Sequence, residues 1–136
     1  MLDKEQLKFV INDALKELYK NDKDLIDNCE NENTLTAKLT CYIQKRIDGY
    51  NVDAFYNRDI KKPKMNSNED KIVPDIVIHK RLNGKFNLAA MEVKGFWNSE
   101  PRKFDEDKLK DLKTKYSYSF IFRIELNEVS GLLIEM

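Results

Sequence analysis

The sequence predicts an α+β fold, with an α/β-like crossover, in which helices flank a mixed central sheet. Two segments near the start carry apolar residues at helical spacing, and three strand-like segments follow them. A further helical segment then precedes two last strand-like segments. Grouped strands with one helical crossover are typical of a mixed sheet that is covered by helices.

Two amphipathic helices are predicted in the first third of the chain. Residues 3–20 carry one stripe of apolar side chains. After a polar connection over residues 21–31, a second helix is predicted to run to about residue 47 and to end at Gly49. Glu32 starts the buried stripe of this helix, so we expect it to point toward the element that the helix packs against. Alternatively, Glu32 only interacts favourably with the partial positive charge at the N-terminus of the helix and has no further role.

A short strand and a lysine-rich loop are predicted next. Residues 52–57 have strand character, and the loop continues through Asp70. Lysines in this region can contact phosphates, because such contacts need little beyond positive charge. A merely solvated run of charge is the alternative. These lysines are Lys61, Lys62, Lys64 and Lys71.

A β-hairpin is predicted in the middle of the chain. Two strongly apolar runs, residues 72–79 and 87–94, flank Asn83-Gly84, a sequence typical of a two-residue turn. With this turn, the numbers of facing residues sum to 167. A longer turn, which would change the pairing, is the alternative.

The predicted register places two carboxylates opposite each other. Asp75 faces Glu92 in a non-hydrogen-bonded pair, where Cα atoms approach to roughly 4.5 Å. Lys94 shares their face of the sheet. Two facing acids repel unless a positive charge lies between them, and a divalent cation would supply it. Alternatively, Lys94 simply pairs with one of the acids at the end of the strand.

One helix and two strands are predicted in the last third. Residues 95–101 break the regularity, and a helix is expected over about residues 103–115. Alternation over 118–125 and an apolar run over 129–135 indicate strands. Trp97 is expected to close over the core, with base stacking as the alternative. The apolar stripe of the helix consists of Phe104, Leu109, Leu112 and Tyr116.

Length and charge indicate one domain, residues 1–136, without general affinity for nucleic acid. A chain of 136 residues that is 41% hydrophobic can form one core. Lys plus Arg and Asp plus Glu each number 24, so any nucleic-acid contact must use a local patch. Neither a signal peptide nor a membrane span is visible, and Cys29 and Cys41 match no zinc spacing. We expect a soluble, cytoplasmic protein with no membrane partner.

The predicted cluster suits metal-assisted hydrolysis. Asp75 and Glu92 can hold Mg²⁺ or Mn²⁺, hard cations that take oxygen ligands, and the backbone carbonyl of Val93 can add one more oxygen. Lys94 would position the attacking water while the metal neutralises charge on the phosphate. Phosphodiester hydrolysis is the reaction that these groups fit best.

These residues resemble a known signature. Pro-Asp at 74–75, followed by Glu-Val-Lys at 92–94, is similar to the motif of the PD-(D/E)XK, or restriction-endonuclease-like, nuclease superfamily. The resemblance implies an αβββαβ core, to which this chain would add an N-terminal helix and a C-terminal strand. It also implies a metal-dependent nuclease site that a glutamate of the first core helix completes. Glu32 matches that glutamate, as a metal ligand directly or through a water.

Four stretches resemble, more closely, a group of small bacterial proteins of this superfamily, most of them uncharacterised. One departure is Phe55, where that group often has an acid before Tyr-Asn-Arg. His79 shares the face of Asp75 but lies roughly 13 Å along the strand, so we expect it to be structural. The four stretches are residues 32–39, 52–58, 73–81 and 87–94.

Three hypotheses about function follow. The first is a Mg²⁺-dependent endonuclease, with Glu32, Asp75, Glu92 and Lys94 as catalytic residues and DNA rather than RNA as the partner. A homodimer or larger complex is compatible with the small size of the chain. The second is a non-catalytic nucleic-acid or protein binding module that retains the nuclease fold. The third is a structural salt-bridge cluster in an unrelated α+β domain, which a distant Glu32 would favour.

Overall fold

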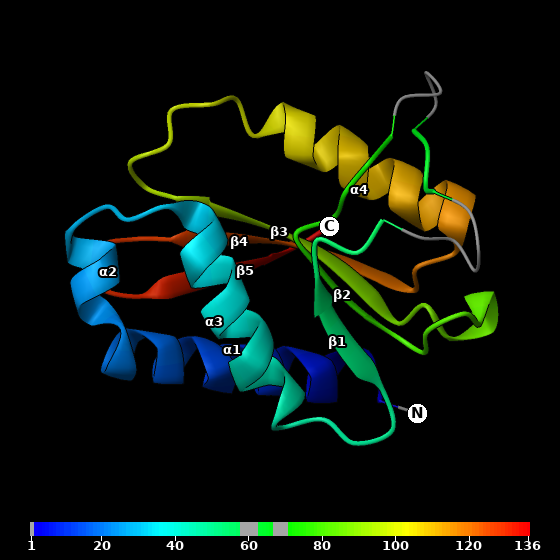
Figure 1. The fold of residues 1–136 in the computed structure, drawn as a ribbon, viewed down its shortest axis with the longest axis horizontal. Helices are drawn as coiled ribbons and strands as arrows, with labels where there is room; N and C mark the ends of the chain where they lie inside the picture. The colour runs from blue at the N-terminus through cyan, green and yellow to red at the C-terminus, as the bar shows by residue number, and fades with distance from the viewer. Residues whose placement is uncertain (1, 58–62, 67–70) are drawn as a thin grey trace.

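The protein has an α+β fold in which helices come first and a five-stranded mixed sheet follows (Figure 1). The structure is a computed structural model, and it describes residues 2–57, 63–66 and 71–136. The N-terminal helices are α1 (Lys4–Asn21), α2 (Lys23–Asp27) and α3 (Glu32–Gln44). The strands are β1 (Asn51–Ala54), β2 (Ile76–His79), β3 (Ala89–Gly95), β4 (Phe120–Leu126) and β5 (Gly131–Glu135).

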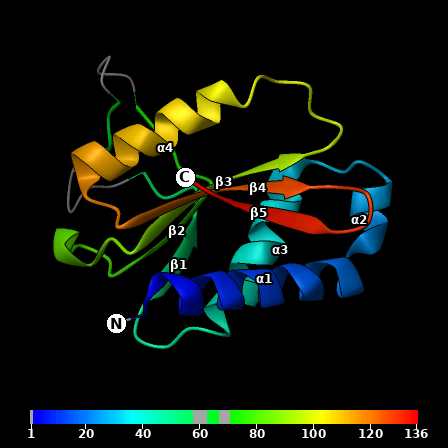
Figure 2. The ribbon, with the colours of Figure 1, turned by 180° about the vertical axis from the view of Figure 1, so that it is seen from behind.

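The strands lie in the order β1-β2-β3-β4-β5. Only β3 and β4 among these neighbours are parallel, and helix α4 (Lys103–Tyr116) forms the crossover between them. Helices α1 and α3 cover one face of the sheet, and α4 covers the other (Figures 1 and 2). The predicted helical crossover and mixed sheet are therefore confirmed. In the described ranges, no helix combines the length and the apolar character that crossing a bilayer requires.

Local signals fix where the helices begin. Asp3 accepts a hydrogen bond from the backbone of Gln6 while the Gln6 side chain accepts one from Asp3, which is a capping box for α1. Asn31 caps α3 through a 2.8 Å bond from the Asn33 backbone, so Glu32 becomes the first residue of this helix. The connection between α1 and α3, predicted only as a polar connection, contains the short helix α2, which buries Ile26.

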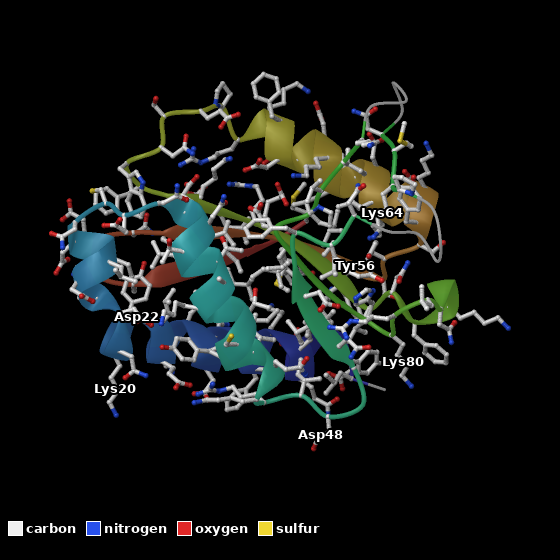
Figure 3. The ribbon with its side chains drawn as sticks, in the orientation of Figure 1. Lys20, Asp22, Asp48, Tyr56, Lys64 and Lys80 are labelled. Carbon is white, nitrogen blue, oxygen red and sulfur yellow. The ribbon has the colours of Figure 1, made fainter. Side chains whose placement is uncertain are left out.

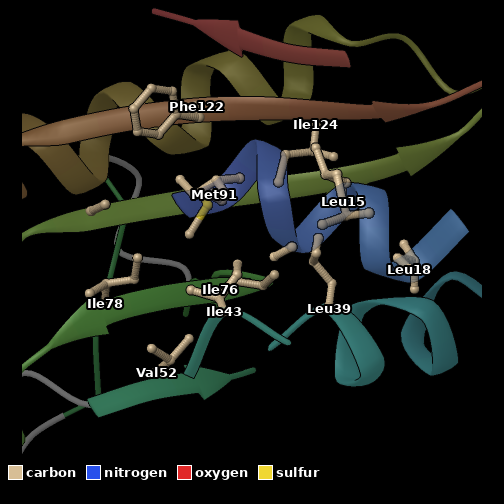
Figure 4. Packing of buried hydrophobic residues seen from close by; sticks show 14 of the residues in the cluster. Leu15, Leu18, Leu39, Ile43, Val52, Ile76, Ile78, Met91, Phe122 and Ile124 are labelled. Carbon is tan, nitrogen blue, oxygen red and sulfur yellow. The ribbon is translucent and has the colours of Figure 1, made fainter. Parts of the chain in front are cut away.

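Alternation along the strands divides the core into two layers. Ile76 and Met91 lie in the layer that faces α1 and α3 (Figure 4), whereas Val77 and Ala90 lie in the layer that faces α4. The larger cluster also contains Leu39 of α3, which is fully buried. Burial of one such side chain contributes about 1.5–3 kcal/mol. Residues on the α4 face of β3 therefore occupy a covered layer, where a charged side chain needs a partner.

The register of the hairpin agrees with the prediction, but the turn does not. Ile76 faces Met91 and Ile78 faces Ala89, as the sum of 167 requires. The chain reverses between Lys80 and Asn83, and the 3₁₀ turn η1 (Gly84–Phe86) follows. The Asn83 side chain accepts a bond from the Lys85 backbone and so starts η1, which is why Asn83-Gly84 does not form the two-residue turn.

Trp97 packs against the main core, as expected. Its ring lies so close to Gly95 that a Cβ atom on this glycine would sit 2.5 Å from the indole. Only glycine permits this approach, so Gly95 lets the chain fold back immediately after β3. The segment that follows is thereby held beside the end of β3, next to the first residue of α3.

Candidate active site

Strand β3 presents its two charged residues to the layer beneath α4. Met91 and Val93 belong to the core on the α1 side, so Glu92 and Lys94 point the other way. Glu92 is 3% exposed and Lys94 is 14% exposed, measured on their side chains. Two ionisable groups are thus held in a largely water-excluded layer at one end of β3.

Asp75 meets Glu92 across the hairpin, as the predicted register requires. The Asp75 backbone donates a 2.7 Å hydrogen bond to Oε2 of Glu92. In return, the Val93 backbone N–H donates a 2.8 Å bond to Oδ2 of Asp75. Each carboxylate therefore accepts a bond from the opposite chain segment, and this exchange fixes the two acids side by side.

Lysine 108 of α4 supplies positive charge to this pair. Its Nζ lies 2.6 Å from Oε1 of Glu92. Lys94 makes different contacts: its Nζ lies 3.5 Å from Oδ1 of Asp105 and 3.5 Å from Oε2 of Glu100. Lys94 does share the face of the two acids, but its ion pairs within the described ranges are with other carboxylates.

Glu32 arrives at the same end of β3 from the first turn of α3. Its Oε2 accepts a 2.6 Å bond from the Gly95 backbone, and its Oε1 accepts a 2.8 Å bond from Nδ2 of Asn98. The charge of Glu32 contributes to the field at Lys94. Glu32 thus points inward, as expected, and lies near Lys94. No hydrogen bond within residues 2–57, 63–66 and 71–136 joins it to Asp75 or Glu92.

Burial and like charge perturb these groups. Burial, followed by repulsion from Asp75, raises the pKa of Glu92 to about 8. Burial also raises the pKa of Asp75 and that of Asp105. For Lys94, burial alone would lower the pKa, but attraction to Asp105, Glu100 and other acids reverses this, and the pKa is raised. Lys94 is accordingly an ammonium group at neutral pH.

The donor set suits a divalent cation although no complete cage is assembled. Among the described residues, no three His, Cys, Asp or Glu side chains are grouped closely enough to hold a metal ion. Mg²⁺, however, usually takes only one or two carboxylates from the protein and keeps several waters. Asp75 and Glu92 supply two, and Oδ2 of Asp105, buried nearby, has no hydrogen-bond partner among the residues that the structure describes. The residues present therefore fit Mg²⁺ or Mn²⁺ by chemistry.

Two residues of this cluster, Asp105 and Lys108, were not among the predicted site residues. They lie on the covered side of α4 with Leu109, whereas Phe104, predicted to be in the apolar stripe, is 63% exposed. The buried stripe of α4 consists of Asp105, Leu109 and Leu112, so starting the predicted stripe at Asp105 would have revealed an acid among apolar residues. That is the same signal by which Asp75 and Glu92 were found.

A second polar cluster, further along the hairpin, has a structural character. Nε2 of His79 lies 2.8 Å from Oδ2 of Asp53, which also accepts a 2.9 Å bond from Nε of Arg81. Burial lowers the pKa of His79, and the ring of Tyr56 packs edge-on against it. The expectation that His79 is a bonded structural residue agrees with these contacts.

Of the predicted phosphate-binding lysines, the two that the structure describes differ in their exposure. Lys61 and Lys62 lie outside the described residues, and Lys71 is exposed. Lys64 is only 1% exposed, with its Nζ 5.0 Å from the centre of the Tyr56 ring (Figure 3). Its assignment as a phosphate contact is therefore wrong, because two aromatic rings and a backbone carbonyl enclose the ammonium group.

A separate groove of about 550 Å³ lies between α1 and the turn from β4 to β5. It is lined by Phe9, Leu15, Tyr19, Val129 and neighbouring residues, without a carboxylate or histidine. Because this lining has no carboxylate or histidine to hold a metal, the acids near the end of β3 remain the candidate active site.

Comparisons with known proteins do not assign a function to this cluster. No protein-family model matches the sequence. Significant matches are likewise absent among curated proteins and among solved structures. The functional argument consequently depends on the residues and contacts described above.

Proposed function

We propose that the protein is a metal-dependent nuclease with a restriction-endonuclease-like fold, which hydrolyses phosphodiester bonds of DNA rather than RNA. The observation that carries this proposal is the contact between Asp75 and Glu92, on the face of the sheet that also bears Lys94. Two buried acids beside each other are costly unless a cation or a proton neutralises them. Sites for divalent cations provide a functional reason to retain them.

The order of the elements supports the proposed fold. From α3 to β4 the chain runs α3, β1, β2, β3, α4, β4, which is the αβββαβ order that the sequence resemblance implies. Helix α1 precedes this core and β5 follows it. Asp75 lies immediately before the second strand of this order and Glu92 lies on the third, while Glu32 is the first residue of its first helix.

Each residue has a distinct part in the proposed reaction. Asp75 and Glu92, with the Val93 carbonyl, would hold Mg²⁺ or Mn²⁺, which supplies positive charge for the phosphate. Lys94 stays protonated, so it acts as a hydrogen-bond donor that orients the attacking water rather than as a base. Glu32 accepts hydrogen bonds from Gly95 and Asn98 and thereby fixes the end of β3, where Lys94 lies.

Cleavage assays test the proposal. Purified protein is incubated with single-stranded and duplex DNA and with RNA, in Mg²⁺ or Mn²⁺, beside the Asp75→Ala and Lys94→Ala variants. We expect cleavage, preferentially of DNA, that each substitution reduces at least about 100-fold. Lys110→Ala is the matched control, because Lys110 is an exposed lysine of α4. Cleavage that survives both site substitutions would come from a contaminant and would remove the support for a nuclease.

A non-catalytic binding module is the second candidate, and one observation favours it. Both charged residues of β3 already have partners on α4, since Lys108 pairs with Glu92 and Asp105 with Lys94. A site neutralised in this way is stable without a metal. Calorimetry with Mg²⁺ and Mn²⁺, with and without nucleic acid, discriminates the two. Absence of any metal binding would favour the module.

A further inference from the structure

Helix α4 places the ammonium group of Lys108 on Glu92, one of the two acids that would hold the metal. Asp105 and Lys108 are three residues apart, so they project from the same side of the helix toward β3. Lys108 reaches Glu92 at 2.6 Å, whereas Asp105 reaches Lys94 at 3.5 Å. Buried Leu109 and Leu112 fix this side of α4 against the sheet. The position of Lys108 is thus set by the packing of the helix.

Both oxygens of Glu92 have partners. Oε2 accepts from the Asp75 backbone and Oε1 accepts from Lys108. A divalent cation bound to Oε1 would lie roughly 2.1 Å from that oxygen. Nζ of Lys108 already lies 2.6 Å from the same oxygen, so the two positive charges would repel each other strongly. The two side chains of this ion pair differ in how far they can move, because the Glu92 side chain is 3% exposed and that of Lys108 is 25% exposed. The lysine is the partner that can move.

We propose that Lys108 and the divalent cation compete for the Glu92 carboxylate, so that metal binding displaces Lys108 from the site. This inference rests on the proposed nuclease function. The displaced ammonium stays tethered beside the metal, where the phosphates of a nucleic acid are its natural new partner. Metal and nucleic acid therefore favour each other's binding. The metal releases Lys108 for the phosphates, and the phosphates hold Lys108 away from Glu92, so the free-energy cost of breaking the Lys108–Glu92 ion pair is shared.

The first experiment compares Mg²⁺ binding, measured by calorimetry without nucleic acid, in the wild type, Lys108→Met and Lys110→Met. Binding is measured at increasing pH from about 8 until it no longer changes, because loss of Lys108 raises the pKa of Glu92 above its wild-type value of about 8 and a proton could otherwise replace the missing ammonium. Lys108→Met is expected to bind Mg²⁺ about tenfold more tightly, because the competing ion pair is gone. Lys110→Met is expected to match the wild type. Equal or weaker binding by Lys108→Met would overturn the competition.

The second experiment observes the displacement directly and needs no destabilising variant. In wild-type protein with ¹⁵N-labelled lysine, the ammonium signal of Lys108 is identified by its absence from Lys108→Arg. Its protons should be protected from exchange without metal, and saturating Mg²⁺ should abolish that protection. Protection that persists at saturation would refute displacement, even if Lys108→Met bound more tightly through reduced repulsion.

Neither experiment depends on cleavage. A protein that cuts DNA but keeps the protected Lys108 signal with Mg²⁺ would refute the competition and leave the nuclease proposal intact. A protein in which Mg²⁺ displaces Lys108 without any cleavage would support the competition and contradict the nuclease. Failure of every variant to bind Mg²⁺, even in the presence of DNA, would refute both.

Discussion

Replacement of Glu92 by Gln is expected to abolish a pH-dependent loss of stability. The pKa of Glu92 is raised from 4.5 to about 8 in the folded protein. Between these values the unfolded chain has released the proton that the folded protein retains. The free energy of unfolding therefore falls as the pH rises through this window, and the loss is complete above the folded pKa.

The size of the effect follows from the shift. Each pH unit inside the window lowers the free energy of unfolding by up to about 1.4 kcal/mol. Across the window, the loss is on the order of 3 to 5 kcal/mol, and the attraction to Lys108 is already included in the shifted pKa. Glu92→Gln cannot ionise, so its stability relative to the wild type should increase by this amount between acidic and alkaline pH.

Urea unfolding at several pH values, from about pH 5 to pH 9, measures this difference. Taking the difference between the two proteins cancels the titrating groups that do not interact with Glu92, whereas Asp75 and Lys108, which do interact with it, contribute to the difference. Glu100→Gln is the control, because Glu100 is an acid of the same cluster whose side chain is 54% exposed. A difference between Glu92→Gln and wild type that stays constant with pH would refute the buried, proton-retaining state of Glu92.

Three further substitutions test the fold around the site, each by urea unfolding. Leu39→Ala should lower the free energy of unfolding by about 2–5 kcal/mol, because Leu39 is fully buried; a change below 1 kcal/mol, roughly a single methylene's worth, would contradict that burial. Gly95→Ala should destabilise by about 1–3 kcal/mol and alter the fluorescence of Trp97, against which the new methyl group would clash. Unchanged emission would contradict the contact. Asp53→Asn should cost about 1–3 kcal/mol by weakening the bonds to buried His79, and a neutral effect would show that these bonds contribute nothing.

The facing acids were predicted from a two-residue turn at Asn83-Gly84, and their register is right although that turn does not form. Val77 and Ala90 are apolar on one face, Ile76 and Met91 on the other, and a slip by one residue would exchange the faces. The register therefore survives although the turn at Asn83-Gly84 was predicted wrongly. Burial of the two faces of β2 and β3 against different helices sets the pairing of these strands, whereas the residues of the turn decide only how the chain reverses.

The partners supplied by α4 could not be predicted in the same way. Asp105 and Lys108 lie in a helix with many charged residues, and choosing the covered side requires knowing how α4 rotates against the sheet. Lys64 shows the same limit, because its burial between Tyr56 and Tyr118 depends on contacts between distant segments. The sequence located Glu32, Asp75, Glu92 and Lys94, and only the tertiary packing showed that Asp105 and Lys108 lie beside them.

The most direct test of the central claim is metal-dependent cleavage by wild type and by Asp75→Ala, purified side by side. DNA is incubated with each protein after removal of metal by a chelator and again after Mg²⁺ is restored. The geometry of Asp75 and Glu92 predicts that the wild type cuts only with Mg²⁺ and that the variant loses at least about 100-fold of this activity. Equal cleavage by both proteins, or cleavage that persists without metal, would contradict a nuclease site built on these two acids.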